Sequence, residues 1–198
     1  MSNKWPTAPG RNDAKGKEER RRFLVATDGE RTEVGYFEWL KKKAVDIIYP
    51  KYIKGNLLKV IKRASEIRNK GNYDLAFVVC DKDQHKETEL NAAIKISKGL
   101  GVILCISNES FEIWLLAHLD KKVDSKASNR KEAQRMAKTA RLVKGDDGKI
   151  INESRFSIDM VNKALVEAER LRKTYGSNIL ESSPTTDVDK VVSRIKLE

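Results

Sequence analysis

The amino-acid sequence predicts an α/β fold in which helices cover both faces of a mostly parallel sheet. Two observations carry this prediction. Short apolar runs of the kind found in buried strands alternate with longer segments whose apolar residues recur at helical spacing. Strands that alternate with helices form parallel sheets, because each connecting helix returns the chain to the same end of the sheet. The 198 residues, 39% of them hydrophobic, suffice for one such domain and a small appendage.

The first part of the chain contains the predicted sheet. Its clearest strand is Leu75–Cys80, an uninterrupted apolar run typical of a central strand that is covered on both faces. Gly99 and Gly101 mark the end of the helix that precedes the last strand. The expected elements are, in order, a strand over 23–27, a helix over 32–43, a strand over 45–49, a helix over 56–69, a strand over 75–80, a helix over 87–98 and a strand over 102–106.

The pattern changes to basic and amphipathic helices beyond Leu119. The expected elements there are a basic helix over 128–142, a Gly-Asp-Asp-Gly loop, a long amphipathic helix over 158–175 and a short helix after Pro184. The predicted organisation is a flexible basic N-terminal tail over 1–22, an α/β core over 23–119 with a mostly parallel four-stranded sheet, and a C-terminal helical extension over 120–198 packed on that core.

The charge of the chain points to a polyanionic partner. The formal net charge is +11, and the basic residues concentrate in two segments, 41–70 and 121–149. A field of this sign attracts nucleic acid, although two solvated helix faces would produce the same composition. The residues expected to contact nucleic acid are Lys59, Lys62, Arg63, Lys131 and Arg135.

Composition also excludes several classes of protein. The two cysteines, Cys80 and Cys105, each sit inside an apolar run, as small buried core residues do, and suggest neither a disulfide nor a metal knuckle. No apolar stretch approaches eighteen residues, and the start of the chain lacks the basic-then-apolar pattern of secretion signals. We therefore expect a cytoplasmic protein without a membrane span.

Polar residues directly follow three of the predicted strands. They are Asp28 after the first strand, Asp81 with Asp83 after the third, and Ser107 with Asn108 after the fourth. The carboxyl ends of parallel strands meet at one edge of a sheet, where such folds place their sites. The sequence therefore predicts that the carboxylates of Asp28, Asp81 and Asp83 share a metal-binding edge.

The strongest local signal is the Asp-Lys-Asp triplet at 81–83. Alternate residues of an extended segment point the same way, so Asp81 and Asp83 could face one cation. Hard cations such as Mg²⁺ take oxygen ligands. A simpler interpretation is that the two acids stabilise the start of the next helix.

A second candidate motif is the segment Thr27–Glu33. Gly29 permits a positive φ or a close approach, and Glu33 is expected to project from the first turn of a helix back toward the strand end. The same pattern has a simpler explanation that needs no functional site, because the helix dipole favours acidic residues in the first turn of a helix.

A third motif is the run Ser107–Trp114. Ser107 or Asn108 is expected to cap a helix, and Glu112 is then a carboxylate in its first turn, at the same edge as the other acids. Glu112 is a candidate metal ligand or a residue that orients a metal ligand. His118 stands two turns inside this helix, so a core or supporting role is favoured over a role as ligand.

The motifs of other enzyme classes are missing. The sequence contains no GxxxxGK[ST], no GxGxxG, no serine elbow and only two histidines. ATPase, dinucleotide-binding and catalytic-triad chemistry therefore lack their residues.

Together, the Asp-Gly pair at 28–29, the Asp-Lys-Asp triplet and the Ser-Asn-x-x-Phe-Glu-x-Trp run closely resemble the RloB-like proteins, a Toprim-related family of bacterial anti-phage and restriction-linked operons. The segment Ser183–Thr186 and the valines after it resemble the closing motif of that family, so the resemblance covers most of the chain. Two positions depart from the family pattern: Asp28 stands where Glu is expected, and Glu109 stands where Pro is expected.

The resemblance implies a Toprim-like three-layer sandwich, the fold shared by primases, topoisomerases and OLD-family nucleases. It implies Mg²⁺ or Mn²⁺ as cofactor. The expected site residues are Asp28, Glu33 and Glu112 as catalytic acids, Asp28, Asp81 and Asp83 as metal ligands, and Asn108 and His118 as supporting residues.

Two functions from different classes follow. The leading hypothesis is a metal-dependent nuclease that hydrolyses DNA or RNA, tRNA included, in phage defence beside a partner ATPase. The alternative is a nucleic-acid-binding or assembly module with weak catalysis, which the shorter acid at Asp28 favours. A primase-like or strand-passing enzyme is a weaker hypothesis, because no motif places a tyrosine for covalent attack.

Overall fold

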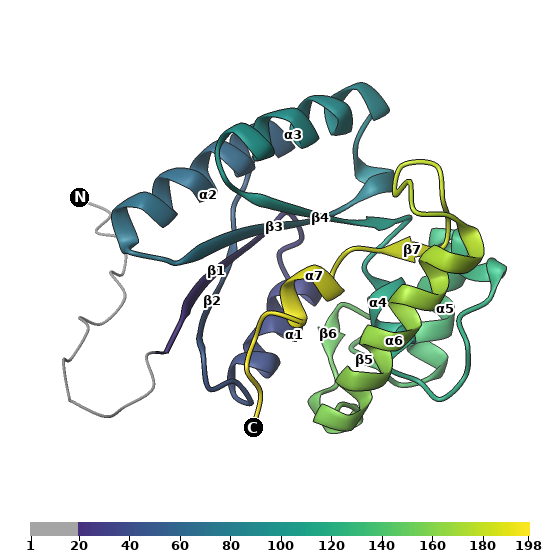
Figure 1. Ribbon diagram of the computed structural model, residues 1–198. Coiled ribbons are helices and arrows are strands. Elements are labelled where there is room, and N and C mark those ends of the chain that lie inside the picture. The colour runs from purple at the N-terminus through teal and green to yellow at the C-terminus, as the bar shows by residue number, and fades with distance from the viewer. Residues whose placement is uncertain (1–19) are drawn as a thin grey trace.

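The computed structural model describes residues 20–198 and shows an α/β fold around a five-stranded sheet (Figure 1). The strand order is β2-β1-β3-β4-β7, and the first four strands are parallel. Residues 1–19 of the expected tail lie outside the described part, and Arg22 already belongs to the first strand. The strands are β1 (Arg22–Thr27), β2 (Ile47–Tyr52), β3 (Leu75–Asp81), β4 (Ile103–Asn108) and β7 (Thr185–Thr186).

The expectation of four strands is wrong, because β7 adds a fifth. This strand of two residues runs antiparallel to β4 and pairs Thr186 with Ser107 and Thr185 with Asn108. The Ser107 and Thr186 hydroxyl oxygens lie 2.9 Å apart. Two adjacent threonines form neither an apolar run nor an alternation, so no sequence pattern marks this strand.

Helices cover both faces of the sheet (Figure 1). Helices α2 and α3 lie on one face, and the helices of the C-terminal half lie with α1 on the other. The seven α-helices among the described residues are α1 (Thr32–Lys41), α2 (Leu57–Gly71), α3 (Glu87–Gly99), α4 (Glu112–Ala117), α5 (Arg130–Thr139), α6 (Ile158–Tyr175) and α7 (Asp189–Val192). Helix α6 spans the predicted residues, and α5 is shorter at both ends than predicted.

The strands contribute alternate residues to two hydrophobic cores. Ala76, Val78 and Cys80 of β3 pack with α2 and α3, whereas Phe77 and Val79 pack on the opposite face. The same alternation holds along β1. It determines the face toward which each acid at a strand end projects.

The segment after Leu119 is not purely helical. Strands β5 (Val143–Lys144) and β6 (Ile150–Ile151) form a hairpin around the Gly-Asp-Asp-Gly loop. Gly145 and Gly148 have φ of 84° and 63°, which suits glycine because it has no Cβ. Residues of β6 and α6 pack in the same core cluster as α1 and α4.

Among residues 20–198, none of the helices has both the length and the apolar character that crossing a bilayer requires.

Candidate active site

Acidic residues from separate strands meet at the carboxyl edge of the sheet. Thr27, the last residue of β1, pairs with Val79 of β3, and Asp81 pairs with Ser107 of β4. The Asp28 backbone N–H donates to the Val79 carbonyl at 3.2 Å. Asp28 and Asp81 therefore lie at the same edge of the sheet, where the strand-end rule places them.

Asp81 faces the side of the sheet that carries α1 and α4. Glu33 in the first turn of α1 and Glu112 at the start of α4 lie close enough to act on its charge. The three acids are only 4–5% exposed and line a cavity of about 250 Å³. Cations border the same cavity, namely Arg31, Arg130 and Lys149.

The β5–β6 hairpin forms one wall of this cavity. Asp147 and Lys149 of the hairpin line it, and Asp147 forms an ion pair with Arg31. The Thr32 hydroxyl donates to the Lys149 carbonyl at 3.2 Å. These contacts hold the hairpin against the start of α1, the helix that carries Glu33.

Burial and mutual repulsion raise the pKa values of the acids. Burial, together with the charges of Asp28 and Glu112, raises the pKa of Glu33 to about 7. Burial also holds the pKa of Asp81 well above its usual range, together with the charges of Glu33, Asp28, Glu112 and Asp83. The cluster thus carries more negative charge than its surroundings stabilise, and a cation would relieve the repulsion.

Two carboxylate oxygens in the cluster have no hydrogen-bond partner within the described part of the chain. They are Oδ1 of Asp28 and Oδ1 of Asp81, and both are buried. Buried polar atoms are normally paired, and carboxylate oxygens are the ligands that Mg²⁺ and Mn²⁺ prefer. The donors present therefore fit a hard divalent cation.

Gly29 allows the Glu33 carboxylate to reach the strand end. A Cβ atom at position 29 would overlap both oxygens of that carboxylate. The Thr27 hydroxyl donates to the Gly29 carbonyl at 2.7 Å and fixes the turn. The expected close approach at Gly29 is thus used by the Glu33 side chain.

Asp83 does not continue the strand, contrary to the argument from alternating residues. Lys82–Gln84 form a 3₁₀ turn, so Asp83 leaves the extended direction of Asp81. Its Oδ2 accepts a hydrogen bond from Arg130 Nη1 at 2.6 Å. Asp83 still acts on the charge of Asp81. No sequence pattern marks Arg130 as the partner of Asp83, because the two residues lie far apart along the chain.

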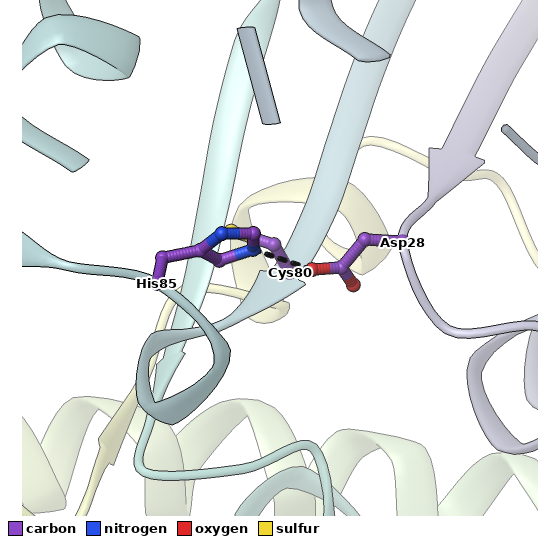
Figure 2. A group of neighbouring side chains, drawn as sticks. All are labelled: Asp28, Cys80 and His85. Carbon is purple, nitrogen blue, oxygen red and sulfur yellow. Dashed lines mark hydrogen bonds and ion pairs between the residues drawn. The ribbon is translucent and has the colours of Figure 1, made fainter. Parts of the chain in front are cut away.

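The Asp28 carboxylate also contacts a histidine from the turn after β3 (Figure 2). His85 Nε2 lies 2.9 Å from Asp28 Oδ2, and His85 Nδ1 lies 3.3 Å from Glu89 Oε2. The pKa of His85 is raised, chiefly by the hydrogen bond with Asp28. Sequence reasoning missed His85, and its only sequence signal is that it follows the Asp-Lys-Asp triplet by two residues.

Cys80 completes a group of possible metal donors with Asp28 and His85. Their donor atoms lie within 4.8 Å of one another, and Figure 2 shows Cys80 behind the other two side chains. Burial holds the pKa of the Cys80 thiol well above its usual range. The thiol therefore stays protonated, in keeping with the buried position that its apolar run predicts.

The two expected supporting residues have different surroundings. The Asn108 amide donates to the Ile179 carbonyl at 2.8 Å and caps no helix. His118 lies in the aromatic core: its Nδ1 donates to the Trp114 carbonyl at 2.9 Å, and its Nε2 lies 3.1 Å from the Tyr36 hydroxyl. Burial lowers the pKa of His118 to about 4. His118 is therefore a neutral core residue and does not line the cavity of the acids.

The residues expected to contact nucleic acid lie at separate places. Lys59, Lys62 and Arg63 line a groove of about 950 Å³ along the first half of α2. Arg135 lines a cavity of about 290 Å³ together with Glu112. Lys131 is exposed on α5 but lines neither cavity.

Comparison with known proteins gives one match. No curated protein matches the chain, and no solved structure matches it. The model of the family described as RloB-like protein matches residues 23–195, so the chain belongs to the RloB-like family.

Proposed function

We propose that this protein is a metal-dependent nuclease of bacterial phage defence, which hydrolyses phosphodiester bonds in DNA or RNA. The observation that carries the proposal is the buried cluster of Asp28, Glu33, Asp81 and Glu112, in which two carboxylate oxygens have no partner within residues 20–198. Asp28 and Asp81 would hold Mg²⁺ or Mn²⁺ through those oxygens. Bound there, the ion would polarise a phosphate and lower the pKa of the attacking water.

The remaining groups have separate tasks in this proposal. Glu33, whose pKa is raised to about 7, can take up or release a proton near neutral pH. Arg130 and Lys149 border the cavity and would bind the phosphate oxygens. The Asp83 carboxylate orients the Arg130 guanidinium through their hydrogen bond. The expected metal ligand Asp83 would thus act through Arg130.

His85 is a positioning residue in this proposal. Its Nε2–H donates to one oxygen of Asp28, which leaves the other oxygen for the cation. Groups that hydrogen-bond to metal ligands fix the orientation of those ligands. Asp28 is one methylene shorter than the Glu expected from the family pattern, so its orientation matters more.

Three further elements of the proposal rest on the motifs at 28–33, 81–83 and 107–114. The first is that the sheet has the Toprim fold, the second is that the protein works with a partner ATPase, and the third is that it is located in the cytoplasm. The parallel strands and the acids at their carboxyl edge are consistent with the first element.

A nucleic-acid-binding or assembly module with weak catalysis is the second candidate. The ion pairs Asp83–Arg130 and Asp28–His85 favour it, because each occupies one oxygen of an expected metal ligand. Under this hypothesis the two pairs replace the metal in stabilising the edge of the sheet.

Incubation with nucleic acids separates the two functions. The purified protein is mixed with labelled plasmid, single-stranded DNA and total RNA, with Mg²⁺, with Mn²⁺ or with EDTA. We expect cleavage of at least one substrate with a divalent ion and none with EDTA. Binding of nucleic acid without cleavage under every metal condition would support the binding module instead.

A further inference from the structure

A basic groove with several apolar lining residues lies beside β2, the strand next to β1. The groove has a volume of about 950 Å³ and lies between the end of β2 and the first half of α2. Its apolar lining includes Tyr52, Ile53 and Leu58. Cationic side chains line it as well, among them Lys54, Lys59 and Lys62.

Part of the positive charge of the groove is not neutralised by the described residues. Over residues 20–198, Lys54, Lys59 and Lys62 form no ion pair. Glu66 is the acid among the lining residues, and it pairs with Arg63. The three lysines therefore present their full charge to a ligand in the groove, which favours a polyanion.

The apolar lining indicates which polyanion fits. A duplex presents phosphates on its outside and keeps the faces of its bases stacked inside, whereas a single strand can turn its bases toward a protein. The Tyr52 side chain makes no ring contact and no hydrogen bond within the described residues. Tyr52 lines the groove, so its ring offers a surface on which a base can stack, while lysines of the groove bind the flanking phosphates.

The strand that lines the groove, β2, pairs with the strand that precedes Asp28. Tyr52 pairs with Thr27 across the β2–β1 ladder, and the Ile53 backbone N–H donates to the Thr27 carbonyl at 3.1 Å. Asp28 is the next residue of that chain segment. Neighbouring strands lie about 4.8 Å apart, so the end of β2 that lines the groove lies about one strand spacing from the segment that carries Asp28.

We propose that this groove binds single-stranded nucleic acid, with a base stacked on Tyr52 and phosphates held by Lys54, Lys59 and Lys62. This proposal rests on the proposed function in one respect. It names single-stranded nucleic acid as the substrate that the groove delivers to the acids. The binding itself does not depend on cleavage.

Binding is measured on the full chain in EDTA, so that cleavage plays no part. Fluorescence anisotropy compares labelled single-stranded DNA and RNA with a duplex of the same sequence. We expect single strands to bind at least about tenfold more tightly than the duplex, because only single strands offer a base for stacking. Tyr52→Ala should weaken binding of single strands about tenfold and leave duplex binding unchanged, whereas Tyr52→Phe, which keeps the ring, should bind like the original protein.

The lysines are tested by charge reversal with a matched control. The triple variant Lys54→Glu, Lys59→Glu and Lys62→Glu should weaken binding of single strands and reduce its salt slope by about 2, since each phosphate contact on a single strand contributes about 0.7. The control variant Lys70→Glu, Lys95→Glu and Lys98→Glu makes the same change of net charge at exposed positions that do not line the groove. It should bind nearly as well as the original protein.

Three results would overturn the groove proposal: equal affinity for duplex and single strand, unchanged affinity in a folded Tyr52→Ala variant, or equal effects of the two triple variants. A thermal melt of each variant shows whether it is folded. The proposed nuclease activity fails on a different result, namely tight binding of single strands without cleavage in Mg²⁺ or Mn²⁺. The two failures are therefore distinguishable.

Discussion

The imidazole of His85 bridges Asp28 and Glu89, with Nε2 2.9 Å from Asp28 Oδ2 and Nδ1 3.3 Å from Glu89 Oε2. An ionised carboxylate only accepts, so the two contacts favour the cationic ring that donates from both nitrogens, and the hydrogen bond with Asp28 raises the pKa of His85. Glu89 Oε1 also accepts the backbone N–H of Leu57 at 3.1 Å, at the first residue of α2. One hydrogen-bonded chain thus connects the acid after β1 to the helix that forms the basic groove.

Removing the imidazole should weaken metal binding. In His85→Ala the Asp28 carboxylate loses the donor that orients it, and partners of this kind typically contribute 10–100-fold to metal affinity. We therefore expect Mn²⁺ affinity, measured by calorimetry or electron paramagnetic resonance, to fall by about tenfold or more. Lys86→Ala, a change at the exposed neighbouring residue, is the control. Unchanged Mn²⁺ affinity in a folded His85→Ala variant would show that Asp28 needs no positioning.

Neutralising Asp81 should stabilise the metal-free protein. Asp81 is 4% exposed, and burial together with four nearby acids disfavours its charge. Asp81→Asn removes that repulsion, so in EDTA the melting temperature should rise, by about 2–4 °C for each 1 kcal/mol gained in a protein of this size. The rise in melting temperature that Mg²⁺ or Mn²⁺ produces in the original protein should disappear in this variant.

Asp83→Asn is the matched comparison, because it removes the same charge two residues away. Asp83 pairs with Arg130, so its loss leaves that guanidinium without its partner and should not stabilise the metal-free protein. If both variants stabilised the protein equally in EDTA, the distinction between the two acids would be wrong.

The position of the site was predictable because it depends on the sheet alone. Apolar runs identify β1, β3 and β4, parallel strands end at one edge, and Asp28 and Asp81 directly follow or end their strands. Glu33 and Glu112 were predictable for a related reason, since each stands in the first turn of a helix that starts at this edge.

Other features depend on tertiary contacts that no local pattern encodes. The 3₁₀ turn at Lys82–Gln84 redirects Asp83, and its partner Arg130 comes from α5. His85 gained a role only once the turn after β3 placed it beside Asp28. The fifth strand, β7, has too few residues for any periodicity to appear.

The stability of the protein should depend on pH through His118. Its Nδ1 donates to the Trp114 carbonyl and its Nε2 accepts from the Tyr36 hydroxyl, so the folded state holds the neutral ring, and burial lowers its pKa to about 4. The unfolded chain has the ordinary pKa of about 6.5 and binds a proton first as pH falls. Stability should therefore fall as pH decreases from about 6.5 to about 4, by up to roughly 3 kcal/mol from this group.

Urea denaturation at several pH values checks this prediction against His118→Gln, which does not titrate. Glu33 acts in the opposite direction, since its raised pKa means that the folded state gains a proton before the unfolded state does. The comparison must therefore be the difference between the two proteins at each pH. A difference that stays constant between pH 4 and 6.5 would contradict the neutral, buried state of His118.

The missing side chain of Gly29 makes room for the Glu33 carboxylate. The Cβ atom of Gly29→Ala would overlap both Glu33 oxygens. Because the atoms in its way belong to the end of a flexible side chain, Glu33 should turn aside and the fold should remain. We therefore expect a melting temperature within about 2 °C of the original protein, which is a change of less than about 1 kcal/mol. Cleavage should be lost, because the Glu33 carboxylate, whose pKa is raised to about 7, no longer reaches the strand end.

Gly99→Ala is the control, since a Cβ there meets nothing within 4 Å, and it should cleave normally. A Gly29→Ala variant that cleaves as fast as the original protein would remove Glu33 from the proposed catalytic residues and leave the cation-binding acids to be tested alone.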